Sequence, residues 1–359
     1  MTGLRDQSLP ATCVAGFFII RSVTMTNFQP DKPFKTYQEQ INLLQQKYGL
    51  IINNSVFAEI ALRNFTYYDL VNGYKDCFII NEKYKPNVSL EMLYMFFMID
   101  RNIQSILFKY SAMVENAFKS KLAYIISANF GVTEAEYLNP NNYNRSHNGI
   151  LLSDVIASCN AIKSNISDIP QPTKHYALKH NHIPAWILFK NLSFSNSINL
   201  FQLLKSKEKK ETANLLYGNS KLPDKQKISF VIDALTTIRK YRNKIAHNLK
   251  FVTFKNYRNP LAPKVLTKII PYDLLTWRDI NKNNRGVNDI YSFILCLFIL
   301  LEDPLIRAFF ISELNDYFSG IESSPDRLTT QCCQEYYKIT NLPPDITKRF
   351  TNYLTKRKR

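Results

Sequence analysis

The clearest hydrophobic pattern in the chain runs over residues 229–249, a stretch that contains neither Gly nor Pro. Its apolar residues recur at helical spacing, and at about 100° per residue they fall within one arc of a helical wheel. We therefore predict one long helix whose apolar arc faces the core. The arc consists of Val231, Leu235, Ile238, Ile245 and Leu249.

The polar positions of this helix form a second pattern. Arg239, Asn243 and His247 make a stripe at positions i, i+4 and i+8, on a face of their own. Arg242 instead falls in or beside the apolar arc, where an unpaired guanidinium is costly to desolvate. We infer that Arg242 has a partner or belongs to a site.

Helical patterns continue along the chain and predict an all-α fold. Thr36, with Glu39 three residues later, has the spacing of a capping box at a helix start. One or two long helices are expected over residues 89–129, and two closing helices over 290–301 and 304–318.

Two further expectations concern single features of this pattern. Residues 252–268 include Pro260 and Pro263 and are predicted to be irregular, with a short β-hairpin. Trp186 directly follows a Pro and an Ala at a predicted helix start, and we expect it to anchor the core.

The same patterns divide the chain into four parts. Residues 1–26 lack helical periodicity and are expected to be a poorly ordered extension or the result of a misassigned start. Residues 30–85 predict a small helical subdomain, and 86–320 a helical domain that contains the long motif helix. Residues 321–359 form a basic segment that ends in KRKR, which we expect to be an RNA-contacting or disordered arm.

Composition and charge indicate a folded protein with a polyanionic partner. The 359 residues are 45% hydrophobic, enough for one large core or two smaller ones. The formal net charge is +17, and residues 201–259 hold 14 Lys or Arg against 4 acids. A basic surface around a phosphate-handling site favours nucleic acid, and the alternative is a solvated basic face. The candidate RNA-binding residues are Arg239, Lys240, Lys244, Lys250, Arg258, Lys209 and Lys210.

The sequence predicts neither a metal site nor a membrane span. The six cysteines contain no CxxC pair, and His175, His180 and His182 lack well-spaced Cys or acidic ligands. No disulfide framework, metal or cofactor is therefore expected. No stretch reaches the roughly 20 apolar residues of a membrane helix, and the N-terminus makes a poor signal peptide. We expect a cytoplasmic protein.

Arg242, Asn243 and His247 spell R-N-x-x-x-H late in the predicted helix. Here the sequence resembles the HEPN ribonucleases, all-helical proteins in which an R-x(4-6)-H motif cleaves RNA without a metal. The resemblance implies that Arg242 and His247 are catalytic, with Asn243 at a usually polar position where it orients the imidazole or contacts RNA. The structural alternative is that Arg242 pairs with a buried acid and His247 is a helix-end residue favourable to the dipole.

These residue types suit the cleavage of RNA, which carries its own nucleophile in the 2′-hydroxyl. A histidine has an unperturbed pKa of about 6.5, so it accepts and donates protons near neutrality. The planar fork of an arginine holds two phosphate oxygens and stays charged throughout the reaction. The motif therefore contains a group for proton transfer and a group for charge stabilisation.

A second resemblance begins at residue 30. The segments KPFKTYQEQINLLQQKYGLIINN and FAEIALRNFTYYDLVNGY resemble the opening of the Abi-like (abortive infection) family of bacterial phage-defence proteins. Asp100, Arg101, Glu115 and Lys119 resemble the family's D-R…E-x-x-x-K helix. In a four-helix HEPN bundle this helix would pack on the motif helix, which makes Glu115 or Asp100 the candidate partner of Arg242.

Together the resemblances imply a HEPN-type helical bundle and an Abi-like endoribonuclease of bacterial phage defence. They also imply a homodimer, because HEPN sites usually form where two motif helices meet. Some members of the family are encoded beside a small noncoding RNA, so a bound RNA that restrains the nuclease is a further expectation. Two alternatives stay open: a non-catalytic RNA-binding or interaction protein, and a metal-dependent nuclease, which lacks a visible acidic triad.

Overall fold

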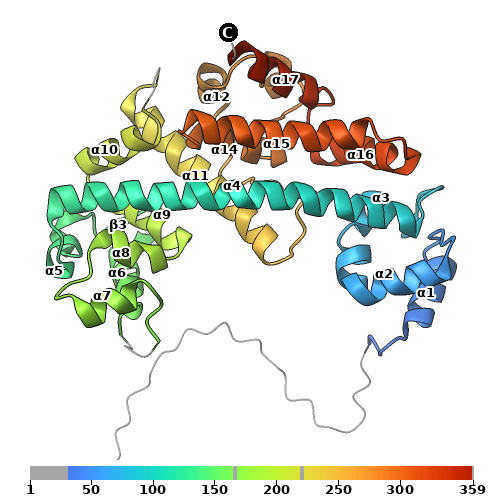
Figure 1. The fold of residues 1–359 in the computed structure, drawn as a ribbon, viewed down its shortest axis with the longest axis horizontal. Coiled ribbons are helices and arrows are strands. Elements are labelled where there is room, and N and C mark those ends of the chain that lie inside the picture. The colour runs from blue at the N-terminus through green and yellow to red at the C-terminus, as the bar shows by residue number, and fades with distance from the viewer. Residues whose placement is uncertain (1–30, 165–167, 219–221, 358–359) are drawn as a thin grey trace, which may run out of the picture.

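The computed structural model describes residues 31–164, 168–218 and 222–357, and the predicted extension over 1–26 lies outside them (Figure 1). The described chain is built of helices, with two ribbons of two short strands each, which confirms the predicted all-α fold. One continuous hydrophobic core joins these helices. The elements therefore form a single packed body around that core.

The axis of the fold is α4 (Leu90–Phe130), which runs along the length of the molecule (Figure 1). The hydroxyl of Ser89 caps its first turn by accepting the N–H of Met92 at 3.2 Å. The helix ends where Gly131 takes a φ of 101°, a conformation that favours glycine. Its 41 residues span roughly 60 Å at 1.5 Å per residue. The predicted long helix is confirmed.

The N-terminal lobe (residues 37–84) packs at one end of α4. Thr36 and Glu39 form the predicted capping box at its first helix. Phe65 joins the lobe to α4 by packing its ring against those of Tyr94 and Phe97. The elements of this lobe are α1 (Tyr37–Gln46), α2 (Ser55–Tyr67), the π-helix η1 (Tyr68–Asn72), α3 (Lys75–Phe78), β1 (Ile79–Ile80) and β2 (Lys83–Tyr84).

The middle lobe (residues 134–203) packs at the other end of α4, on the same side as the N-terminal lobe (Figure 1). Its helix α8 buries Leu188 and Phe189, whereas Trp186 is 44% exposed on the outer face, so the prediction that this Trp anchors the core was wrong. The elements are α5 (Glu134–Tyr137), the 3-10 helix η2 (Pro140–Asn142), β3 (Ser146–His147), β4 (Ile150–Leu151), α6 (Leu152–Ala161), α7 (Thr173–Lys179), α8 (Ala185–Asn191) and α9 (Phe194–Leu203).

The central helices follow the middle lobe in the chain, and the first, second and last of them pack on α4. The central helices are α10 (Ser206–Leu216), α11 (Asp224–Ala246), α12 (Pro263–Ile269), α13 (Trp277–Asn281) and α14 (Ile290–Leu300). Helix α11 packs on α4 and on α14, and every residue of α14 is buried, as its unbroken apolar run predicts. Within residues 252–268 the structure has turns and the start of α12 in place of a hairpin, so that prediction was wrong.

The C-terminal helices cover the other side of α4. They are α15 (Pro304–Glu322), α16 (Arg327–Thr340) and α17 (Ile346–Arg357). Helix α16 packs on α4 and α17 packs on α15, burying Tyr336, Ile346 and Phe350. The expectation of a disordered arm was wrong for residues 327–357, because apolar residues at helical spacing between the cations supply a buried face.

Candidate active site

The motif lies where α11 ends. The helix stops at Ala246, three residues before the predicted end, because the chain closes it with a Schellman turn. Asn248 takes the left-handed conformation with φ of 51°, which asparagine tolerates better than most residues. The N–H of Leu249 then donates to the carbonyl of Lys244 at 2.9 Å, and that of Asn248 to Ile245 at 3.2 Å.

This turn changes the surroundings of two predicted residues. His247 becomes the C-cap of α11 rather than an internal helical residue. Leu249 is 49% exposed and does not belong to the core arc, so its assignment there was wrong. The remainder of the arc is confirmed: Val231, Leu235 and Ile238 are fully buried, and Ile245 packs against the core.

Arg242 has the acidic partner that its position demands. Its guanidinium forms an ion pair with Glu115 of α4, and Lys119 contacts the other carboxylate oxygen at 2.7 Å. The Arg242 side chain is 27% exposed, against 11% for Glu115. One carboxylate thus faces two cations in a cluster that reaches the surface on the Arg242 side. We call these three residues the Glu115 cluster.

Asn243 links the two ends of the motif through different atoms. Its side-chain oxygen accepts a hydrogen bond from Nη1 of Arg242 at 3.0 Å. Its backbone carbonyl accepts the N–H of His247 at 3.1 Å. The amide of Asn243 is therefore engaged with the guanidinium rather than with the imidazole.

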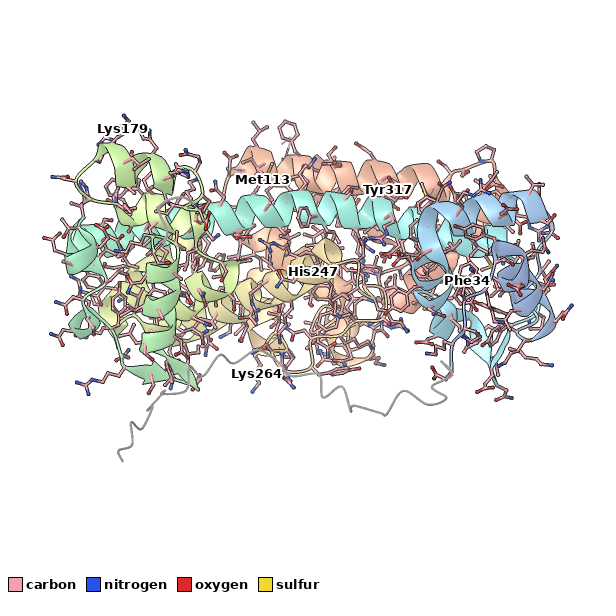
Figure 2. The ribbon with its side chains drawn as sticks, turned by 90° about the horizontal axis from the view of Figure 1, so that it is seen from below. Phe34, Met113, Lys179, His247, Lys264 and Tyr317 are labelled. Atoms are coloured by element: carbon pink, nitrogen blue, oxygen red, sulfur yellow. The ribbon has the colours of Figure 1, made fainter. Side chains whose placement is uncertain are left out.

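The imidazole of His247 is exposed. It lies near the centre of the face seen in Figure 2, with the two lobes on either side. A polynucleotide or a second copy of the chain can therefore reach it.

Asp100, the other candidate partner of Arg242, serves a different role. It is 1% exposed and accepts hydrogen bonds from Gln104, Tyr74 and Tyr336 at 2.5, 2.8 and 3.1 Å. Burial raises its pKa to about 6, although the three donors oppose the shift. Asp100 therefore joins the N-terminal lobe, α4 and α16, and the proposal that it pairs with Arg242 was wrong.

Arg101 holds the turn after the motif, a role that its sequence position alone did not reveal. Its Nη1 donates to the side-chain oxygen of Asn248 at 2.7 Å, and its guanidinium lies over the ring of Phe97 at 5.0 Å. Two residues on, Lys250 forms an ion pair with Asp76 of the N-terminal lobe. The segment that carries His247 is thus fixed from α4 and from that lobe.

Beside the motif, α11 and the segment that follows the turn enclose a basic pocket of about 490 Å³. Its lining includes four of the predicted RNA-binding residues and contains no acid. Burial lowers the pKa values of Arg239, Lys240 and Lys244, and the nearby charges of Arg239 and Arg258 lower that of Lys240 further. The lining residues are Arg239, Lys240, Asn243, Lys244, Phe254, Lys255, Asn256, Tyr257 and Arg258.

The other three predicted RNA-binding residues lie outside this pocket. Lys250 is paired as described above, and Lys210 of α10 forms an ion pair with Asp224 at 2.7 Å. Lys209 donates to the backbone carbonyl of Gln202 at 2.7 Å. The structure thus brings together the cations of α11 with Arg258, and it leaves those of α10 apart.

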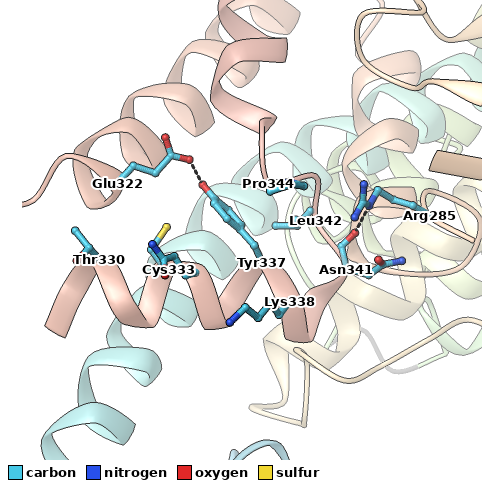
Figure 3. A pocket seen from close by; sticks show the side chains of 10 residues that line it. Arg285, Glu322, Thr330, Cys333, Tyr337, Lys338, Asn341, Leu342 and Pro344 are labelled. Atoms are coloured by element: carbon cyan, nitrogen blue, oxygen red, sulfur yellow. Dashed lines mark hydrogen bonds between the residues drawn. The ribbon is translucent and has the colours of Figure 1, made fainter. Parts of the chain in front are cut away.

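A larger cleft of about 580 Å³ lies away from the motif, along α16 and the turn that follows it (Figure 3). Its polar groups are engaged with one another. The hydroxyl of Tyr337 donates to Glu322 at 2.5 Å, and Nε of Arg285 donates to the carbonyl of Asn341 at 2.7 Å. These contacts hold the C-terminal helices together and leave no unpartnered charge that would select a ligand.

The described chain has neither a clustered metal site nor a membrane-spanning helix. It contains no group of three or more His, Cys, Asp or Glu side chains arranged to hold a metal ion. The rings of His175 and His180 pack on each other and on Tyr176. None of the helices within the described ranges combines the length and apolarity of a membrane span.

One comparison with known proteins gives a match. The family model described as Abi-like protein matches residues 60–252, more than half of the chain. The match begins in α2 and ends after the Schellman turn, so it contains α4, the Glu115 cluster and the motif. No curated protein and no solved structure matches the chain.

Proposed function

Because the chain belongs to the family of Abi-like proteins, we propose that it is an endoribonuclease of bacterial abortive infection, in which Arg242 and His247 cleave RNA without a metal. Family membership suggests a part in defence, and the motif suggests the chemistry. The observation that carries the proposal is the position of the motif. It ends in an exposed imidazole, beside a pocket lined by cations and no acid.

The proposed reaction uses the nucleophile of the RNA itself. His247 removes the proton of the 2′-hydroxyl, and the 2′-oxygen attacks the adjacent phosphorus. The bond from phosphorus to the 5′-oxygen breaks, and that oxygen takes a proton from an imidazolium. The products are a 2′,3′-cyclic phosphate and a 5′-hydroxyl. Arg242 stabilises the charge that develops on the phosphate oxygens.

The Glu115 cluster is compatible with this role of Arg242. Lys119 balances the charge of Glu115, so the cluster keeps one net positive charge. An arginine has five N–H donors. The bonds to Glu115 and Asn243 orient the guanidinium and leave further donors on its exposed side for a phosphate.

The spacing of the motif favours a homodimer. Residues five apart on a helix point about 140° apart, so Arg242 and His247 of one chain leave α11 in different directions. Two copies that face each other through the ends of α11 would place the guanidinium of one beside the imidazole of the other. The second imidazole would then supply the proton that the 5′-oxygen takes.

The test is the substitution His247→Ala in the full chain. We expect cleavage of RNA and toxicity to cells to be lost while RNA affinity stays within about twofold, because an exposed imidazole contributes little to binding. His175→Ala is the matched control, since His175 is also exposed but lies on α7. Wild-type activity should persist in EDTA, which separates the proposal from a metal-dependent nuclease.

The second candidate function is a non-catalytic RNA-binding or interaction protein. The ion pair between Arg242 and Glu115 favours it, because that contact alone would account for an arginine beside the apolar arc. RNA binding without cleavage by the wild-type chain would favour this candidate, and undiminished cleavage by the His247→Ala variant would show that the motif is not catalytic. Sequencing RNA that copurifies with the chain would identify the substrate, or a bound noncoding RNA that restrains it.

A further inference from the structure

The net positive charge of the basic pocket favours the binding of an anion. Five cations share its lining, and no carboxylate does. In addition to burial, the charges of Arg239 and Arg258 lower the pKa of Lys240 against a smaller opposing effect of Asp233, so these cations repel one another, and the repulsion grows as they are withdrawn from water. An anionic ligand would relieve it.

Hydrogen bonds within the protein fix the side chains that line the pocket. Nζ of Lys240 donates to the side-chain oxygens of Asn256 and Asn259, at 2.7 Å in each case. Asn256 is 2% exposed and is itself held by the hydroxyl of Thr237 at 3.0 Å. Neutral amides thus fix the ammonium in place without cancelling its charge, which leaves it available to a phosphate.

The pocket also offers aromatic faces beside the cations. Nζ of Lys244 lies 4.4 Å from the centroid of the Phe254 ring, a cation–π contact that orients the ammonium. Tyr257 stands at the rim with 73% of its surface exposed. A phosphate site with an exposed aromatic ring next to it has the composition of a nucleotide subsite.

We propose that the basic pocket binds one unpaired nucleotide of an RNA chain, with its phosphate among the cations of α11 and its base stacked on Tyr257. The proposal rests on the proposed function for the identity of the ligand. A base inside a duplex has no free face, so only a single strand can fill the pocket. Asn243 lines the pocket and accepts a hydrogen bond from Arg242. A nucleotide bound in the pocket would therefore position the rest of the RNA relative to the motif.

The first experiment measures binding by the otherwise intact His247→Ala protein, which removes cleavage from the assay. The probes are pentauridylate and a 16-base-pair RNA duplex. Tyr257→Ala should weaken pentauridylate binding by about tenfold, in the range typical of one lost base stack, and leave duplex binding unchanged. Tyr272→Ala is the matched control, because Tyr272 is 72% exposed and lies outside the pocket.

The second experiment separates the ionic contribution from the stacking contribution. Arg258→Gln should weaken pentauridylate binding and reduce the slope of log affinity against log salt by about 0.7, the value for one phosphate contact on a single strand. Tyr257→Ala should leave this slope unchanged. Arg278→Gln is the control, since Arg278 is exposed on α13 and does not line the pocket.

Three outcomes would overturn the proposal: equal effects of Tyr257→Ala and Tyr272→Ala, equal affinity for the duplex and the single strand, or competition by uridine monophosphate at the affinity of pentauridylate. The last outcome would identify a free nucleotide as the ligand. These results are independent of catalysis. If the wild type cuts no RNA but single-stranded RNA still binds selectively, the nuclease proposal is refuted and the pocket proposal stands. If the wild type cuts RNA and Tyr257→Ala changes neither cleavage nor binding, the pocket proposal is refuted and the nuclease proposal stands.

Discussion

Asp279 and Glu115 are largely buried carboxylates that each face two cations, and their two clusters differ in how far they reach the surface. Asp279 is 2% exposed, and its partners Arg285 and Arg349 are each 11% exposed. In the Glu115 cluster, Arg242 is 27% exposed. The first cluster, which we call the closed cluster, is nearly buried, and the second opens beside the motif.

The closed cluster is part of the fold. Burial disfavours the charge on Asp279, but hydrogen bonds from Arg349, Thr276 and Arg285 outweigh it and lower its pKa to about 2. These bonds join α13, α17 and the segment before α14. Every charge is used within the protein. The Glu115 cluster fixes one side of its arginine and leaves the other side to solvent, as a binding site requires.

The largest effect that distinguishes the clusters is expected from Asp279→Ala. It removes the buried counter-charge of Arg285 and of Arg349, which keeps only its exposed ion pair with Asp345, at a cost of about 3–5 kcal/mol of unfolding free energy. Urea denaturation measures the loss, and cleavage per folded molecule should not change. Asp273→Ala is the control: its ion pair with Lys356 is exposed and is worth about 1 kcal/mol or less. Equal losses from the two variants would contradict the distinction.

Glu115→Gln should lower the unfolding free energy less than Asp279→Ala does, and it should lower the cleavage activity more. Loss of a charge-assisted hydrogen bond is worth about 1.5–3 kcal/mol, and the guanidinium of Arg242 would lose its orientation. We expect cleavage to fall at least tenfold, measured as kcat/KM. Glu59→Gln, in the exposed pair with Arg63, should change neither quantity appreciably. Full activity in Glu115→Gln would show that this cluster too is purely structural.

Acid should weaken the closed cluster in a defined pH window. The pKa of Asp279 falls from 3.8 to about 2 on folding, so its contribution is complete above pH 4 and is lost as the pH falls through 2. The shift of nearly two units corresponds to about 2 kcal/mol. Urea denaturation at pH 5 and at pH 3 should show a smaller stability gap between wild type and Asp279→Ala at pH 3. A constant gap would refute the assignment.

The smallest effect on stability is expected at Arg101, which holds the turn after the motif through its hydrogen bond to Asn248. Arg101→Gln removes the hydrogen bond to Asn248, at a cost of about 1 kcal/mol. Because that bond holds the turn carrying His247, kcat should fall while RNA affinity stays the same. Arg63→Gln, in an exposed pair with Glu59, serves as the control. A change in affinity without a change in kcat would place Arg101 in binding instead.

Local patterns predicted much of the candidate site. The wheel position of Arg242 demanded a partner, and Glu115 proved to be that partner. The two candidates differ in where they lie along α4: Glu115 meets α11, whereas Asp100 lies where Tyr74 and Tyr336 approach. Nothing in the local sequence distinguishes these positions, because contacts across the bundle depend on where the helices cross.

Two features of the site could not be predicted from the hydrophobic periodicity of the sequence. The basic pocket combines α11 with Arg258 and Tyr257 from an irregular segment that was expected to hold a hairpin. The end of α11 was placed three residues too late, because Asn248 in a left-handed conformation outweighs the apolar spacing of Leu249. Sequence periodicity reports which face of a helix is apolar and does not report where a cap stops it.

The amino-acid sequence by itself determined the helices of this protein, its excess of positive charge and its R-N-x-x-x-H motif, since these depend on side-chain chemistry and on spacing within one helix. Only the tertiary structure decided which carboxylate holds Arg242, which cations surround a pocket and that His247 faces outward. Those outcomes depend on how α4 and α11 cross and on how the segment beyond α11 folds back. That geometry is set by packing between residues far apart in the chain.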